Sequence, residues 1–317
     1  MNEIIVLKLG GSVVTRKSEA GIIDTVRIHE FAAQIAPIAK SVPLVIVHGA
    51  GSCGHPEAKA YHIQDGVSRE NAEGAAITHF AVRRLNEAFV SVLRNCGVDA
   101  VCMHPFCNSL AKNGRLVYSG EKQVKAMLNL GIVPVLHGDV VMDTARGACI
   151  VSGDQVVSAM AKALVATPKL CDSVKGQLED TRRSYVPEHG FAARLHGNSI
   201  HLQNTGVCSV HPPAFSSVLA SRGVGSICFA AGAVRVGVAT DVSGVFSGNS
   251  VVPVITRCNV GAINLGNSKN TDVTGGMRGK IEELLFLADA GISSHLFHIS
   301  RVVDFLEERD HGGTIVR

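Results

Sequence analysis

Several features that mark other classes of protein are absent from this sequence or nearly so. It has no Trp, only 4% aromatic residues and ten Pro among 317 residues. Its nine Cys form no CxxC pair and are odd in number, which favours reduced thiols over a disulfide framework. The first apolar run, residues 1–11, is too short and wrongly flanked for a signal peptide or a membrane span. We therefore expect a cytoplasmic protein with no membrane partner.

A strong charge bias is also lacking. The formal net charge is +3, and the charged residues are spread along the chain without a basic arm or stripe. This pattern argues against a nucleic-acid partner, whereas a phosphorylated small ligand needs only a few local cations. What the chain does contain is 46% hydrophobic residues and 33 Gly, which is typical of an α/β protein with many tight strand-to-helix turns.

Three apolar runs have the length and composition of buried parallel strands. Residues 4–9 end in Gly-Gly-Ser, residues 42–47 in His-Gly-Ala-Gly, and residues 132–136 in His-Gly-Asp. A fourth strand is expected from residue 235. Helical spacing of apolar residues predicts helices over residues 27–40, 71–95, 121–130, 155–165 and 281–290. Alternating strands and helices predict a mostly parallel sheet covered on both faces, with ligands at the carboxyl edge of its strands.

The first strand exit combines a cation with exposed backbone. Lys8 stands at the end of the predicted strand, and the glycines that follow it leave backbone amides open to phosphate oxygens. A simple tight turn would give the same pattern, and the chain has no GxxxxGK[ST] phosphate-binding loop. The segment alone therefore leaves the choice open.

Further candidates follow other glycine-rich segments. His55 falls where a helix should begin, and its imidazole could donate a hydrogen bond to an anionic ligand, although a structural histidine is the alternative. Lys280 ends the glycine-rich stretch 272–280. Lys17 would complete a set of three lysines suited to phosphoryl transfer, but from sequence alone it is a solvated loop residue.

Taken together and in this order, these segments resemble the amino-acid kinase family, and within it the isopentenyl phosphate kinases. The resembling segments are KLGGSVVTRK (8–17), HGAGSCGHPEA (48–58), GIVPVLHGDVVMD (131–143), IVSGDQV (150–156), ATDVSGVF (239–246), TDVTGGMRGK (271–280) and the closing GTI. They span the chain except for about 65 residues in the middle. The resemblance implies an αβα fold with an open, mostly parallel central sheet between helices.

The resemblance also implies a domain organisation and ligands. Residues 1–163 would bind the acceptor, a phosphate monoester with isopentenyl phosphate as the expected substrate, and residues 164–317 would bind ATP. Mg²⁺ would assist the transfer, with no metal-ligating residue assigned, and the protein would be a homodimer. This activity belongs to isoprenoid biosynthesis by an alternative mevalonate route.

Site residues can be transferred only at matching motif positions. The catalytic set implied by the resemblance is Lys8, Lys17 and His55. The nucleotide would be bound by Lys8, Gly10, Gly11, Ser12, Gly51, Asp241, Gly276 and Lys280. The acceptor would be bound by Ala50, Gly54, His55 and Gly153, with His55 donating to its phosphate.

Two other functions remain open. Fosfomycin kinases share the histidine at the position of His55, so a fosfomycin-type phosphonate kinase is one alternative. A catalytically silent, nucleotide-binding member of the family is the other, although the intact lysines and histidine argue against it. Two departures from the family pattern are single residues. Cys53 stands where an aromatic residue of the pocket wall is usual, and Ser243 replaces the Asp of the archaeal pattern, an acid that members of the eukaryotic type also lack.

The third departure is the stretch at about residues 170–231, which lacks periodicity and interrupts the usual connection between a helix and a strand. One hypothesis is a functional insertion that forms a lid or a partner-binding loop. Another is a retained intron translated in frame. Cys208, His211 and Cys228 have zinc-ligand chemistry, but their irregular spacing favours scattered polar residues.

Overall fold

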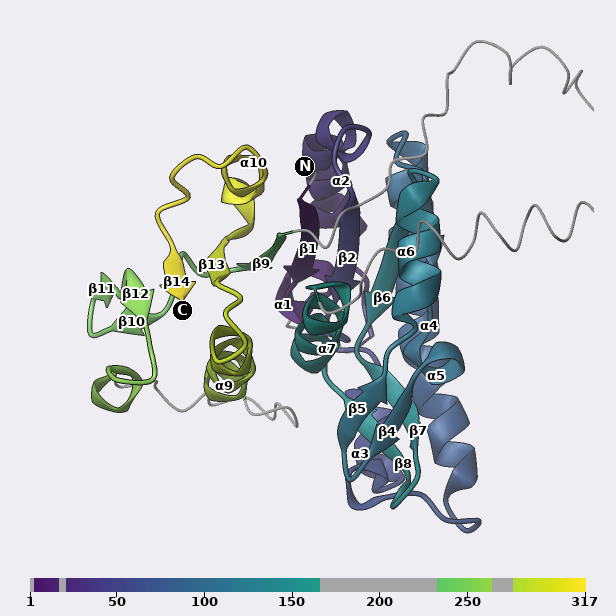
Figure 1. Cartoon of the computed structure of the whole chain (residues 1–317). Helices are drawn as coiled ribbons and strands as arrows, with labels where there is room; N and C mark the ends of the chain where they lie inside the picture. The colour runs from purple at the N-terminus through teal and green to yellow at the C-terminus, as the bar shows by residue number, and fades with distance from the viewer. Residues whose placement is uncertain (1–2, 17–20, 166–232, 264–275) are drawn as a thin grey trace, which may run out of the picture. The chain divides into compact units, whose positions relative to one another are not determined.

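The computed structural model describes residues 3–16, 21–165, 233–263 and 276–317. The centre of this part of the chain is an eight-stranded sheet (Figure 1). In spatial order its strands are β12 (Val254–Ile255), β14 (Thr314–Val316), β13 (Ser294–His298), β9 (Val234–Thr240), β1 (Ile4–Leu9), β2 (Leu44–His48), β6 (Val133–His137) and β3 (Ala100–Cys102). The six strands from β13 to β3 run parallel, and β14 with β12 runs opposite to them.

The central strands form because their side chains are apolar on both faces, as in a parallel sheet that is covered on both sides. In β1, Ile4 and Val6 join one hydrophobic core, while Ile5, Leu7 and Leu9 join another on the opposite face. This alternation is the two-residue period of a strand. The sheet therefore separates two cores.

Helices cover each face. One core is closed by α2 (Thr25–Ala39), α4 (Ala72–Asn95) and α10 (Val302–Leu306). The other is closed by α6 (Glu121–Asn129), α7 (Gly153–Val165) and α9 (Gly276–Ala288). The shorter helices are α1 (Gly11–Val14), α3 (His55–Ala60), α5 (Pro105–Asn108), η1 (Ile63–Asp65), η2 (Val260–Ala262) and η3 (Ile299–Arg301).

A second sheet extends from the exit of β6. Its order is β5 (Arg115–Tyr118), β4 (Leu110–Lys112), β7 (Asp139–Asp143) and β8 (Gly147–Val151), and a separate hairpin pairs β10 (Phe246–Ser247) with β11 (Ser250–Val251). Asp143 ends β7 and accepts hydrogen bonds from four backbone N–H groups, those of Asn113, Gly114, Ala145 and Arg146. Burial raises the pKa of Asp143, but these donors outweigh it and lower the pKa to about 2. The carboxylate thus joins two turns.

The predicted mostly parallel sheet between two layers of helices is confirmed. Each of the predicted helices is present with ends shifted by a few residues, and α7 and α9 begin earlier than expected. The sequence analysis did not predict the second sheet or the strands β12 to β14. In the described ranges, no helix is long and apolar enough to cross a membrane.

The division into domains at residue 163 stays a prediction. β1 from the first half and β9 from the second are adjacent parallel strands, paired from Ile4–Val234 to Leu9–Ala239. Most of residues 164–233 lie outside the described residues. The whole stretch at 170–231 also lies outside the described residues. The structure therefore tests neither hypothesis for this stretch, nor the zinc-ligand chemistry of its Cys and His residues.

Candidate active site

Four strands of the central sheet end in one row. The register places Leu9 opposite both His48 and Ala239, and it places His48 opposite His137. Their exits surround a cavity of about 590 Å³, which is also lined by α3, α4, α7, β8 and α9. Ligands of open α/β sheets bind at this carboxyl edge, so the cavity is the candidate site.

Two glycine turns meet at the centre of the cavity. A Cβ atom at Gly11 would lie 2.5 Å from the Cα and N atoms of Gly51, and one at Gly49 would lie 2.7 Å from the N atom of Gly11. Gly51 also has φ +59°, and a Cβ there would lie 2.1 Å from Oγ1 of Thr15. Side chains are therefore excluded at these three glycines, whose backbone lines this part of the cavity.

Two lysines of the cavity share one carboxylate. Nζ of Lys8 lies 2.6 Å from Oδ2 of Asp154, and Nζ of Lys280 lies 3.3 Å from Oδ1 of the same side chain. Lys8 comes from the end of β1, Asp154 from the first turn of α7 and Lys280 from the second turn of α9. A Cβ atom at Gly153 would lie 3.2 Å from Cε of Lys8, so the glycine leaves room for that side chain.

Burial dominates the electrostatics of this group. It lowers the pKa of Lys8, and Lys280 lowers it further, while Asp154 acts in the opposite direction. Burial alone would raise the pKa of Asp154, but the two lysines outweigh it and lower that pKa. Asp154 therefore stays ionised, and it is the group that favours the charged form of Lys8.

The neighbouring exits of β1 and β9 are joined by a side-chain hydrogen bond. Oγ of Ser12 donates to Oδ1 of Asp241 at 2.9 Å. Thr240 is buried, and its hydroxyl donates to the carbonyl oxygen of Val242, which shapes the turn. Gly276 opens α9 one turn before Lys280 and lines the same cavity.

Another part of the cavity, around His55, is less charged. His55 is the first residue of α3, and Gly54 before it has φ +82°, a conformation that favours glycine. Among the described residues, the His55 side chain makes no hydrogen bond. Apolar side chains line the wall beyond it: Ala58, Val82, Ile150 and Val151. This part of the cavity can hold an anion next to a hydrocarbon group.

The match to known proteins agrees with this geometry. The model of the amino acid kinase family matches residues 3–172. The chain belongs to the amino acid kinase family. Over 315 residues it is 30% identical to the isopentenyl phosphate kinase of Haloferax volcanii, covering 99% of this chain and 98% of that relative. Over 311 residues it is 32% identical to the isopentenyl phosphate kinase of Methanothermobacter thermautotrophicus, covering 93% and 91%.

Solved structures agree with the fold. X-ray structures of isopentenyl phosphate kinase include one that superposes with a TM-score of 0.68 and 26% identity, covering 99% of this chain and 100% of that one. The amino acid kinase fold predicted from the motifs is therefore confirmed for this chain.

The structure brings the predicted site residues together, with one exception. The predicted residues that line the cavity are Lys8, Gly10, Gly11, Ser12, Ala50, Gly51, Gly54, His55, Gly153, Asp241, Gly276 and Lys280. Lys17 lies outside the described residues. The role of each residue stays a prediction, because cavity position alone does not assign a ligand.

The sequence analysis did not select Asp154 or Asp139, both of which line the cavity. Each stands directly after a Gly in a segment that resembles the family, SGDQV or HGDVVMD. An acidic residue after a glycine at the carboxyl edge of the sheet was the signal that could have selected them.

The donor groups of the cavity can be compared with the ligands that Mg²⁺ prefers. No group of three or more His, Cys, Asp or Glu in the described ranges has the arrangement to hold a metal ion. Three carboxylates, Asp139, Asp154 and Asp241, line the cavity. Asp139 already accepts hydrogen bonds from the N–H groups of Phe106 and Val140, which leaves Asp154 and Asp241 as the candidate ligands. This donor set fits Mg²⁺, which keeps several waters and binds through one or two carboxylates together with substrate phosphates.

Proposed function

We propose that this kinase transfers the γ-phosphoryl group of ATP to the phosphate of isopentenyl phosphate, forming isopentenyl diphosphate. One observation supports this most directly: a single cavity is lined both by two lysines around Asp154 and by His55 together with apolar side chains. The lysines suit a triphosphate, and His55 with its apolar neighbours suits a phosphate monoester with a short hydrocarbon chain. The relatives from Haloferax volcanii and Methanothermobacter thermautotrophicus support the same substrate.

In this proposal the residues act by positioning and by electrostatic stabilisation. A terminal oxygen of the acceptor phosphate attacks the γ-phosphorus of ATP, and the bond from that phosphorus to the β–γ bridging oxygen breaks. No general base is needed, because the second pKa of a phosphate monoester is about 6 and the oxygen is largely ionised at pH 7. Negative charge gathers on the transferred group and on the leaving oxygen of ADP.

In this proposal the lysines stabilise that negative charge. Lys8 and Lys280 would contact the β- and γ-phosphates, held in place by Asp154, and Lys17 would stabilise the moving phosphoryl group. The amides from Gly10 to Ser12, with the backbone of Gly51 and Gly276, would bind the triphosphate, and Asp241 would lie beside the nucleotide. Mg²⁺, when bound, neutralises phosphate charge, and Asp154 and Asp241 are the carboxylates that would hold it.

The acceptor would be held by His55, donating to its phosphate, and by the backbone of Ala50, Gly54 and Gly153. The apolar wall excludes water from the hydrocarbon chain, which stabilises binding by about 0.8 kcal/mol for each buried CH₂ group. We further propose that the protein is a cytoplasmic homodimer, that residues 1–163 form the acceptor-binding domain, and that residues 164–317 form the ATP-binding domain.

The first test is an ADP-release assay with purified protein, ATP and Mg²⁺. Isopentenyl phosphate, dimethylallyl phosphate and fosfomycin are compared as acceptors. We expect the highest kcat/KM with isopentenyl phosphate. Turnover of fosfomycin alone would instead identify a phosphonate kinase, and no turnover with any acceptor would indicate a silent family member.

The role of His55 is tested by His55→Ala. Loss of a hydrogen bond to a charged phosphate removes about 1.5–3 kcal/mol, so kcat/KM for the acceptor should fall about 10- to 150-fold. The KM for ATP should change little, because the residue lies in the part of the cavity proposed for the acceptor. His29→Ala is the matched control, since His29 is exposed on α2. Unchanged acceptor kinetics in His55→Ala would contradict the assignment.

A further inference from the structure

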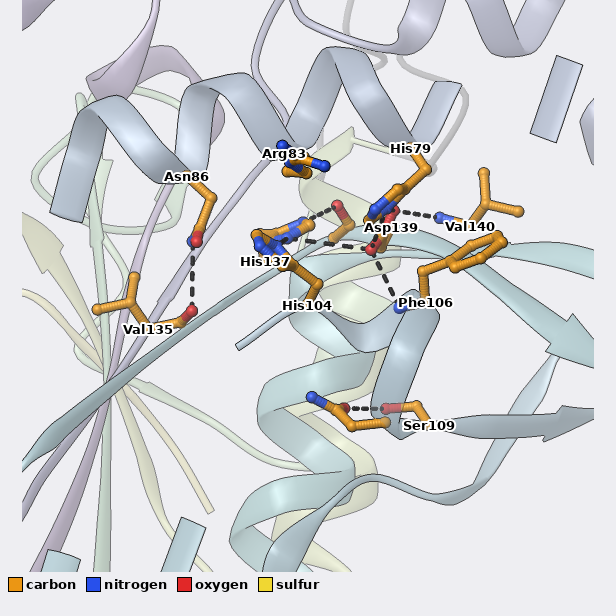
Figure 2. Close-up of polar contacts among 12 residues, drawn as sticks. His79, Arg83, Asn86, His104, Phe106, Ser109, Val135, His137, Asp139 and Val140 are labelled. Atoms are coloured by element: carbon orange, nitrogen blue, oxygen red, sulfur yellow. Dashed lines mark hydrogen bonds and ion pairs between the residues drawn. The ribbon is translucent and has the colours of Figure 1, made fainter. Parts of the chain in front are cut away.

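Three polar side chains of α4 are buried, those of Thr78, His79 and Asn86, and the last two form hydrogen bonds with residues of the strands. His79 is 7% exposed and Asn86 is fully buried. They are seven residues apart, which is about two helical turns, or roughly 10 Å along the axis. Both make directional contacts with strand residues (Figure 2).

The first contact joins α4 to the exit of β6. Nδ1 of His79 lies 3.0 Å from each carboxylate oxygen of Asp139, the first residue of β7. The same carboxylate accepts from the N–H of Phe106 at 3.1 Å and of Val140 at 2.9 Å. Asp139 therefore connects α4, α5 and β7 at the wall of the cavity (Figure 2).

The second contact joins α4 to β2 and β6. Nδ2 of Asn86 donates to Nε2 of His48 at 2.9 Å and to the carbonyl oxygen of Val135 at 3.2 Å. Nδ1 of His48 donates to the carbonyl oxygen of Gly49 at 2.9 Å, so Nε2 keeps its lone pair and accepts from the amide. Burial lowers the pKa of His48 to about 4, which keeps the ring neutral.

Close to these two contacts, α4 lines the part of the cavity next to His55. Thr78 and Val82 line it, one turn apart on the helix. A Cβ atom at Gly54 would lie 2.6 Å from Cγ2 of Val82 and 3.6 Å from the carbonyl oxygen of Thr78. Gly54 is the residue directly before His55. The position of α4 therefore limits where α3 can begin.

Hydrophobic contacts are not directional, so they fix the axial position of α4 less strictly than hydrogen bonds do. Buried hydrogen bonds at two points resist an axial shift, because it would leave further polar groups without partners. We propose that His79 and Asp139 are positioning residues for the acceptor, which act by fixing α4 and through it the position of His55. This inference rests on the proposed contact of His55 with the acceptor phosphate.

The test compares two amide substitutions. In His79→Asn the side-chain nitrogen is as many bonds from Cβ as Nδ1 of His79, so it can still donate to Asp139. In His79→Gln the nitrogen lies one bond further out. We expect His79→Gln to raise the KM for isopentenyl phosphate about tenfold, because a catalytic or binding group displaced by about 1 Å can cost up to about 10²-fold. His79→Asn should stay near the wild type, and neither variant should change the KM for ATP.

Glu87→Gln is the control, because Glu87 is on the same helix and, within the described part of the chain, its side chain forms just an exposed ion pair with Arg83. Equal KM values for isopentenyl phosphate in the Asn and Gln variants would overturn the proposal. A rise in the KM for ATP together with the KM for isopentenyl phosphate would also overturn it, because that is the result of a merely structural role.

A second measurement does not depend on turnover. Hydrogen–deuterium exchange should be faster over residues 53–61 in His79→Gln than in His79→Asn or in the wild type, because a loosened α4 no longer holds the start of α3. If wild-type protein fails to phosphorylate isopentenyl phosphate, the proposed function is wrong, and the exchange result still decides whether His79 fixes α3. Identical exchange in the two variants would count against the inference.

Discussion

Replacing Asp154 with Asn tests the arrangement of the two lysines most directly. The carboxylate accepts from Lys8 on Oδ2 at 2.6 Å, and from Lys280 on Oδ1 at 3.3 Å and on Oδ2 at 3.4 Å. An Asn side chain has the same shape but only one acceptor oxygen. Whichever way the amide turns, its NH₂ group faces one of the two ammonium groups, and two donors at these distances repel each other. At least one lysine must therefore leave its position.

The size of the effect follows from that displacement. Removing one group that stabilises transition-state charge typically lowers kcat by about 10²–10³, or about 2.7–4 kcal/mol. We expect Asp154→Asn to lower kcat by about that factor at saturating ATP and acceptor, measured by ADP release. Asp65→Asn is the control, because Asp65 is an exposed carboxylate outside the cavity. A kcat within about threefold of the wild type in folded Asp154→Asn protein would refute the reasoning.

Two further predictions concern the framework of the site. Gly51→Ala should destabilise the protein by more than the roughly 1 kcal/mol of an ordinary glycine replacement, because the new Cβ would lie 2.1 Å from Oγ1 of Thr15 and the residue has φ +59°. Urea denaturation measures this loss of stability. Gly131→Ala is the control that separates the clash from the backbone strain, because Gly131 has φ +73° but no atom within 4 Å of a Cβ there. Asp143→Asn should flatten the loss of stability at acid pH: the pKa of Asp143 is lowered to about 2, so its stabilisation is present above about 4 and is lost as pH falls toward 2. A wild-type-like acid profile in Asp143→Asn would contradict the second prediction.

The sequence was sufficient to predict the centre of the fold because burial on both faces makes parallel strands apolar throughout. β1 was predicted at residues 4–9 and is found at Ile4–Leu9. β2 and β6 were placed within two residues of their actual ends, since each apolar run stops at a His-Gly pair. The glycines then indicated where the chain turns at the carboxyl edge, and the cavity lies there.

The second sheet could not be predicted in this way. β4 has three residues, and β5 has three exposed positions among its four. In β7 the exposed Met142 interrupts a buried run, and the strand begins and ends with Asp. Short strands with partly exposed faces give little periodicity. The sequence DVVMD was recognised as a motif, but its pairing with β8 and β4 depends on contacts that no local pattern encodes.

The candidate site shows the same limit. The strand exits indicated which segments would meet, so Lys8, His55 and Lys280 could be proposed from sequence. The carboxylate between two lysines from distant segments was not proposed, because a shared contact across β1, α7 and α9 appears only when the helices are placed. The contact between His79 and Asp139 was not predicted either, because the sequence around a histidine on a long helix does not indicate which residue it will contact.

The proposed binding of ATP by Lys8 and Lys280 depends on Asp154 in a way that the number of charged groups alone does not predict. Asp154 reduces the net positive charge of the group that it forms with the two lysines, and by charge alone its removal would strengthen the binding of a triphosphate. However, burial and Lys280 both lower the pKa of Lys8, and Asp154 is the group that opposes them. Without the carboxylate, the ammonium form of Lys8 loses its main stabilisation, and the lysine can become neutral instead of adding a charge. Removal of Asp154 should therefore not tighten ATP binding, because the negative charge is what keeps a second positive charge in this part of the cavity.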